Sequence, residues 1–199
     1  MTKKAPREKR IADIINAAVL EFVEKGYEAA SMESISERAG LTKGGLYHYF
    51  SGKDDVLLAA NATYMEPVYR FMSQASRKKS ACAGLRRYIR NYLKHWAAHP
   101  RETTFTLLSL TKMLTRTDLW PSIESYTDEM ITFYQNLFEQ GVSRGELQPH
   151  DTRGRALAMM ASLDGITAYM IMSRLSPHRC AVYLEHAFID DIALQRKEN

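Results

Sequence analysis

The residues best suited to chemistry form a basic and aromatic group between positions 43 and 53. Lys43, Tyr47, His48 and Tyr49 supply an ammonium group, two phenol hydroxyls and an imidazole. Such donors suit phosphate oxygens and the acceptor atoms of the DNA major groove. Lys53 follows at the expected start of another helix, whose N-terminal amides favour a phosphate. We interpret the group as a DNA-binding surface; the alternative is a surface helical turn with a packed Tyr-His-Tyr cluster.

Two short helices joined by a tight turn would position these donors. Ser31 can cap the first helix through its hydroxyl, and Gly40 suits the left-handed conformation at its end. Thr42 can cap the second helix, in which Leu46 and Phe50, four residues apart, point inward. The pattern predicts a helix-turn-helix whose second helix lies in the major groove.

Residues 7–60 resemble the N-terminal DNA-binding domain of TetR-family transcriptional regulators. The matching positions are Gly26-Tyr27, Ser31, Ala39-Gly40, Leu46-Tyr47-His48-Tyr49-Phe50 and Lys53. The resemblance implies phosphate contacts and contacts near the base edges. The phosphate contacts would be Thr42, Tyr47, His48 and Lys53, and the groups near base edges would be Lys43, Gly44 and Tyr49. Together with Ser31, these residues are the predicted DNA-binding set. Gly45 stands where many relatives carry a small hydroxyl residue, so the operator sequence is harder to predict.

Composition places the chain among soluble globular proteins, because 45% of its 199 residues are apolar and 25% are charged. The net charge is +4, and a basic arm at residues 1–10 holds five Lys or Arg against one acid. Residues 11–60 hold four bases and eight acids, so the cations of a DNA-binding domain must gather on one side. The sequence shows neither a run of about 20 apolar residues nor a signal peptide. We therefore expect a cytoplasmic protein without a membrane partner.

Helical periodicity runs nearly throughout, and no strand pattern is visible. This predicts an all-α fold, with an N-terminal three-helix helix-turn-helix domain and a C-terminal helical ligand-binding and dimerisation domain. We expect the division near residue 60, giving a DNA-binding domain at 1–60 and an effector-binding domain at 61–199. Pro67 predicts a kink or a break. The expected helices are 7–25, one from about 53, 83–98, 102–116, 121–143, 151–174 and 178–194.

The segment 156–172 is apolar nearly all round, so it needs cover on two sides. Packing within the chain can provide one cover, and a partner chain is the simplest second. We expect a homodimer through the two C-terminal helices, with the seam completed by Val182, Phe188, Ile189 and Ile192. The alternative is an ordinary buried core helix.

Aromatic residues and methionines crowd the second domain, and such side chains can line an apolar pocket or form a plain core. The predicted pocket for an apolar or amphipathic small-molecule effector comprises Tyr88, Tyr92, Trp96, Phe105, Trp120, Tyr126, Phe133, Met159 and Asp164. Arg86, Arg87 and Arg90 indicate either a solvated helix face or attraction for an anionic ligand such as a fatty acid or an acyl-CoA.

These features predict a ligand-responsive repressor that binds double-stranded DNA at a palindromic operator. The competing hypothesis is an architectural or protein-interaction DNA-binding factor with no small-molecule effector. An enzyme is not expected, because no glycine-rich phosphate loop or catalytic triad is visible. His95 and His99 lie four residues apart, but without a neighbouring carboxylate they are read as surface residues. No metal or cofactor is expected.

Overall fold

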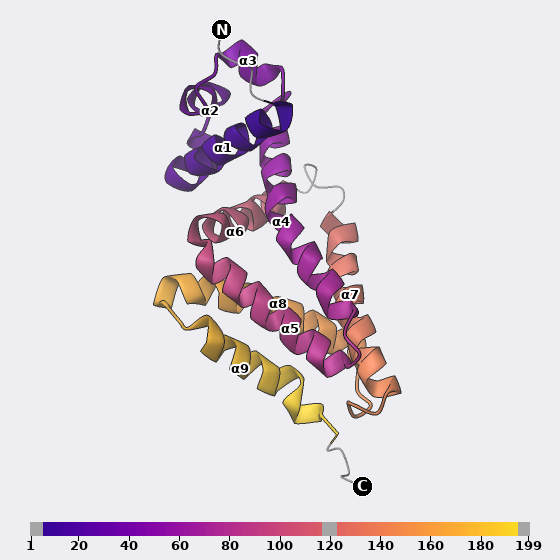
Figure 1. The fold of residues 1–199 in the computed structure, drawn as a ribbon. Helices are drawn as coiled ribbons and strands as arrows, with labels where there is room; N and C mark the ends of the chain where they lie inside the picture. Colours follow the sequence, from indigo (N-terminus) through magenta and orange to yellow (C-terminus); the bar gives the residue numbers. More distant parts are fainter. Residues whose placement is uncertain (1–5, 117–122, 195–199) are drawn as a thin grey trace. The chain divides into compact units, whose positions relative to one another are not determined.

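The computed structural model describes residues 6–116 and 123–194, and these ranges are helical without a strand (Figure 1). The all-α prediction is therefore confirmed. The helices are α1 (Arg7–Ala29), α2 (Met32–Arg38), α3 (Lys43–Tyr47), α4 (Lys53–Ser76), α5 (Ala81–Ala98), α6 (Pro100–Thr115), α7 (Ile123–Ser143), α8 (Thr152–Ser173) and α9 (Pro177–Phe188). A short 3-10 turn, Asp190–Ile192, follows α9.

The chain forms two compact units. The first unit joins residues 1–66 to residues 104–119, and the second joins residues 67–103 to residues 120–199. This division differs from the one expected at residue 60, because part of α6 packs with the first unit. The rings of Phe105 and Phe22 stack 6.1 Å apart, and Asn61 Nδ2 donates to Ser109 Oγ over 3.1 Å. The boundary between the units falls at Pro67, where the sequence predicted a kink or a break. The α4 helix continues through Pro67, so it does not break there.

Local signals in the first unit place its helix ends where the sequence predicted them. Gly26 has φ 79° and ψ 160°, which interrupts α1 at the residue that only glycine suits. Ser31 and Ser34 form a reciprocal capping box at the start of α2. Gly40 has φ 65° and turns the chain between α2 and α3. Thr42 Oγ1 accepts from Gly45 N over 3.1 Å and so caps α3.

The second unit is a helical bundle in which α5 packs on α7, α8 and α9. The apolar stripe predicted for α5 is buried, and its members include Leu85, Tyr88, Ile89, Leu93 and Trp96. In Figure 1, α5 and α9 run side by side. The second unit therefore has its own core, which excludes water from one face of each of these helices.

The α8 helix is long and apolar enough, by length and composition, to span a bilayer. Its buried residues are Ala156, Met159, Leu163, Thr167 and Met170, and they lie along the side that meets α5, α7 and α9. We therefore interpret α8 as a helix that packs one side on the second unit and leaves much of its apolar surface outside.

Candidate nucleic-acid interface and effector region

The α3 helix presents most of the predicted DNA-binding residues to solvent. Thr42, Lys43, Gly44 and His48 are exposed, and the Tyr47 residue is 46% exposed. The inward positions predicted for this helix are confirmed, because Leu46 and Phe50 are buried. Tyr49 is half-buried, and its ring meets the His48 ring edge-on at 5.3 Å between centroids. The buried pair thus fixes a short helix whose other side carries the donors.

The two glycines of α3 face different surroundings. A Cβ added at Gly44 would meet nothing within 4 Å, so its backbone is open to an approaching surface. A Cβ at Gly45 would lie 3.2 Å from Thr42 Oγ1, the atom that caps the helix. Gly44 therefore suits close contact with DNA, whereas Gly45 leaves room for the cap.

Lys43 forms an ion pair with Glu33 across the turn between α2 and α3. Both side chains are exposed, and the Glu33 carboxylate raises the pKa of the Lys43 ammonium by its hydrogen bond and its charge. Exposed pairs of this kind contribute little to stability, because water and salt screen them. The pair therefore holds Lys43 beside α3 but can exchange cheaply for a phosphate or a base edge.

The Lys53 ammonium is half-buried and donates hydrogen bonds to backbone carbonyl groups at the C-terminal end of α1. Its Nζ lies 2.6 Å from the Tyr27 carbonyl oxygen and 2.9 Å from that of Ala30, and 4.3 Å from the Tyr27 ring centroid. Burial lowers its pKa, and the Glu28 charge partly opposes this. Lys53 thus joins α4 to the α1–α2 connection, and its predicted contact with phosphate stays a prediction.

Ser31 is half-buried at the start of α2, and its hydroxyl already accepts from Ser34 N over 3.1 Å. Its part in DNA binding also stays a prediction. Sequence reasoning missed Arg38, which donates from Nε to Glu21 Oε1 over 2.7 Å and from Nη2 to Glu24 Oε2 over 2.6 Å. These contacts fix α2 on α1. They also neutralise two of the acidic side chains of this acid-rich unit.

The comparisons with known proteins agree with this geometry. The sequence profile described as "Bacterial regulatory proteins, tetR family" matches residues 14–60, which contain α2, α3 and their caps. The chain is a TetR-family transcriptional regulator. The expectation that it is not an enzyme is confirmed by that family and fold.

Relatives extend the similarity beyond the matched segment. An HTH-type transcriptional regulator of Bacillus subtilis strain 168, YfiR, is 26% identical over 73% of this chain and 72% of its own. The fatty acid degradation regulator FadR of Bacillus halodurans has a similar structure, with a TM-score of 0.78, 24% identity, and coverage of 94% and 97% of the two chains. FadR of Bacillus subtilis, solved with stearoyl-CoA, has a TM-score of 0.74 and 18% identity over 91% and 98%.

In the second unit of this TetR-family regulator, the predicted pocket residues pack on one another. Tyr88, Tyr92, Trp96, Phe133 and Met159 are buried. The Tyr88 ring centroid lies 5.7 Å from that of Tyr92 and 5.1 Å from that of Phe133. These side chains thus form a packed aromatic core in this structure.

Two members of the predicted pocket set fall elsewhere. Phe105 belongs to the first unit, where its ring packs on Phe22 and meets Tyr64 edge-on. Trp120 lies outside the described residues. A small apolar cavity of about 10 Å³ does lie beside Phe105, lined also by Leu57 and Leu108, and it has room for about one water molecule.

Asp164 carries the main polar group beside the aromatic core. The Tyr92 hydroxyl donates to Asp164 Oδ1 over 3.0 Å. Desolvation by the surrounding protein raises the pKa of the Asp164 carboxyl, and the hydrogen bond from Tyr92 opposes part of that rise. Tyr126 is half-buried nearby, and its pKa is raised by burial and by the Asp164 charge. A hydroxyl-bearing ligand could exchange with Tyr92 at this carboxylate.

The arginines on the basic face of α5 have partners within the second unit. Arg90 donates to both oxygens of Glu185, from Nε over 2.6 Å and from Nη2 over 2.7 Å, and Arg86 reaches the same carboxylate over 3.3 Å. Glu185 is 4% exposed, so these cations neutralise a buried charge on α9. Arg86 also pairs with Asp190, and Arg87 donates to Gln74 over 3.3 Å. Arg86 and Arg90 therefore join α5 to α9, while Arg87 and Arg90 remain exposed as the solvated-face interpretation expects. Attraction of an anionic ligand stays a prediction.

Proposed function

We propose that this regulator represses transcription as a homodimer on a palindromic operator in the cytoplasm, and that a small amphipathic effector releases it. The observation that carries the proposal is the exposed donor set of α3 on a buried Leu46–Phe50 base. A two-fold dimer sets two such helices about 34 Å apart, which matches successive major grooves.

An apolar surface on α8 and α9 supports the dimer. Met172 is 75% exposed and Tyr169 is 59% exposed, and they belong to a group of exposed apolar residues of the kind that marks interaction sites. Small exposed residues on α8, including Ala158, Ala161 and Gly165, would let a second helix approach closely. The exposed large apolar residues of this surface are Leu157, Tyr169, Met172, Leu175, Val182 and Tyr183.

The seam differs from the one expected. Ile189 and Ile192 are buried within their own chain and Phe188 is half-buried, so these side chains are not free for a partner. Val182 remains exposed on α9 and belongs to the proposed interface. The turn at 189–192 folds back on the second unit, which the helical spacing of the sequence could not reveal.

A long-chain acyl-CoA is the effector class that we propose. Bacillus subtilis FadR was solved with stearoyl-CoA, and a fatty acid metabolism regulator of Bacillus subtilis is 24% identical over 74% of this chain. In the second unit, the acyl chain would enter by separating the aromatic residues around Tyr88 and Tyr92. The Asp164 carboxylate would offer a polar anchor for a hydroxyl or amide of the ligand.

A second candidate is a DNA-binding factor with no small-molecule effector. The close packing of Tyr88, Tyr92 and Phe133 favours it, because a ligand would have to open a core that is complete without one. Both candidates share α3 and the apolar surface of α8 and α9.

DNA binding and effector release test the proposal together. Footprinting on the DNA that flanks the coding region, at physiological salt, should show two-fold-symmetric protection that an unrelated duplex lacks. Stearoyl-CoA should abolish the protection, whereas coenzyme A alone should not. Protection that survives saturating stearoyl-CoA and other acyl-CoA chain lengths favours the second candidate.

A matched pair of variants tests the dimer. Met172→Glu introduces a charge into the α8 surface, and Leu114→Glu does so on α6 at 76% exposure. The first should yield monomers in sedimentation and lose operator protection, while the second should remain dimeric. Equal sedimentation of both variants and wild type as dimers would place the interface elsewhere.

A further inference from the structure

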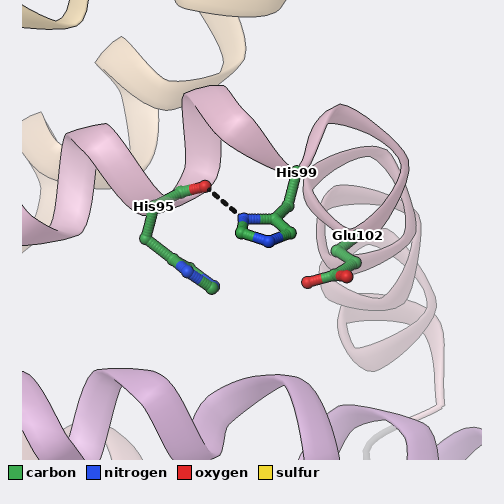
Figure 2. Close-up of side chains that lie close together, drawn as sticks. All are labelled: His95, His99 and Glu102. Atoms are coloured by element: carbon green, nitrogen blue, oxygen red, sulfur yellow. Dashed lines mark hydrogen bonds between the residues drawn. The ribbon is translucent and has the colours of Figure 1, made fainter.

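The corner between α5 and α6 gathers three side chains with metal-ligand chemistry. His95 lies in the last turn of α5, His99 follows its end, and Glu102 lies in the first turn of α6. One ligand atom from each falls within 4.8 Å of the others (Figure 2). From the sequence alone, His95 and His99 are interpreted as surface residues because no neighbouring carboxylate is apparent. The structure does place a carboxylate beside them, because the turn at Pro100 brings Glu102 close to both histidines.

We propose that His95, His99 and Glu102 form a binding site for a divalent transition-metal ion such as Zn²⁺. All three residues belong to the second unit, so the site is complete within one compact part of the chain. Two imidazoles and one carboxylate match the three-ligand sets that bind Zn²⁺ and leave a further position for water.

The hydrogen bonding of His99 prepares it as a ligand. Its Nδ1 lies 2.8 Å from the His95 carbonyl oxygen, which can only accept, so Nδ1 carries the proton. The other ring nitrogen, Nε2, therefore keeps its lone pair. Metal-ligating histidines commonly donate their second nitrogen to a backbone carbonyl in this way, which fixes both tautomer and ring orientation.

His95 supplies a buried nitrogen that needs a partner. Its Nε2 is shielded from solvent and makes no hydrogen bond within residues 6–116 and 123–194. A buried polar atom without a partner costs about 1–3 kcal/mol, which coordination would recover. The ring is held by Trp96 and Phe71, whose centroids lie 5.0 Å and 5.7 Å from its own. Burial lowers the pKa of His95, and the Arg70 charge lowers it further, which favours the neutral form.

The donor set selects the class of ion. Imidazole suits Zn²⁺, Ni²⁺, Co²⁺ and Cu²⁺, whereas Mg²⁺ and Ca²⁺ prefer oxygen ligands. In a tetrahedral shell with Zn–N bonds of about 2.0–2.1 Å, neighbouring ligand atoms lie about 3.3 Å apart. The three side chains would close from 4.8 Å by small rotations, which their positions at a helix end and in a first helical turn allow.

Arg70 is the neighbouring cation that opposes binding. It is exposed, and its charge reaches His95. Removing this charge should strengthen the affinity for a dication, by about 2- to 5-fold at a screened distance. A structural role for the histidines alone would give no such change, so Arg70→Gln separates metal binding from packing.

Titration of untagged protein with Co²⁺ tests the site, because ligand-field bands in the visible report a protein-bound ion. We expect bands that saturate at one ion per protomer, that Zn²⁺ displaces and that Mg²⁺ does not. His99→Gln and Glu102→Gln should each weaken Co²⁺ affinity by at least about 10-fold. Zn²⁺ should raise the melting temperature of wild type but not of His99→Gln.

His150→Gln is the matched control. The His150 Nδ1 also lies 2.8 Å from a carbonyl oxygen, that of Gln148, and its Nε2 is also buried without a partner among the described residues. It belongs to no group of three ligands in the described ranges, so its variant should bind Co²⁺ like wild type. Circular dichroism in EDTA verifies that each variant is folded. Absent bands in wild type, or bands that survive in His95→Gln/His99→Gln, would overturn the proposal.

Discussion

Tyrosine has opposite uses in the two units. In the first unit, Tyr47 stands 46% exposed on a five-residue helix, where its hydroxyl is open to a partner. In the second unit, Tyr88 and Tyr134 are buried, and the Tyr134 hydroxyl donates to that of Tyr88 over 3.0 Å. The difference follows from helix length and spacing rather than from residue type. The short helix α3 is held by two buried side chains, so its other side chains stay exposed to solvent. The long amphipathic helix α5 instead buries the aromatic rings along one whole face.

The largest expected effect comes from removing a ring of the packed core. Tyr88→Ala should lower the free energy of unfolding by about 3–5 kcal/mol, because it leaves a cavity among Tyr92, Phe133 and Tyr134. Urea unfolding followed by circular dichroism measures the change. Tyr88→Phe keeps the ring and should cost less, although the Tyr134 hydroxyl loses its partner. A mild effect of Tyr88→Ala would indicate that these rings surround space rather than fill it.

Lys53 tests whether the first unit uses a half-buried cation for stability. Lys53→Met keeps most of the side-chain length but removes the donor to the Tyr27 and Ala30 carbonyls, and it should cost about 1.5–3 kcal/mol. Lys43→Met removes an exposed, solvent-screened ion pair and should change stability much less than Lys53→Met does. Urea unfolding compares the two. If both variants were equally stable, Lys53 would be kept for DNA alone.

Tyr47 should show the reverse pattern, with an effect on binding and none on folding. Tyr47→Ala should weaken operator affinity by about 10-fold through loss of a phosphate contact, while its unfolding free energy stays within about 0.5 kcal/mol of wild type. Fluorescence anisotropy with a labelled duplex measures the affinity. Tyr47→Phe distinguishes the hydroxyl from the ring, and wild-type affinity in both variants would remove Tyr47 from the interface.

The sequence predicted local structure better than it predicted packing. The caps at Ser31 and Thr42 and the turn at Gly40 depend on neighbours a few residues away, so their pattern is visible in the chain itself. The joining of Arg90 to Glu185 and the approach of Glu102 to His95 depend on how distant helices or a helix corner pack. The hydrophobic periodicity of the sequence does not indicate which side chains of different helices come into contact. The same limit hid the aromatic core, since rings at helical spacing line a pocket and fill a core alike.

The smallest expected effect concerns a carboxylate that caps a helix. Glu146 accepts from the backbone amides of Ala81 and Cys82 over 3.1 Å and 3.0 Å, and from Ser80 Oγ over 2.7 Å. Burial alone would raise the pKa of Glu146, but these donors outweigh it and the pKa is lowered. A lowered pKa means that the stabilisation is full above the unfolded-state value of 4.5 and is lost as pH falls through the folded-state value.

Glu146→Gln should therefore cost about 1 kcal/mol at neutral pH, and the gap from wild type should narrow below about pH 4.5. Urea unfolding across that range measures the gap. Glu129→Gln, an exposed position on α7, should follow wild type at every pH. A gap that stayed constant into acid would mean that Glu146 acts through its size and neutral hydrogen bonds. The start of α5 would then be held by neutral hydrogen bonds, in contrast to the ion pairs of Arg86 and Arg90 with Glu185 that join α5 to α9 in the same unit.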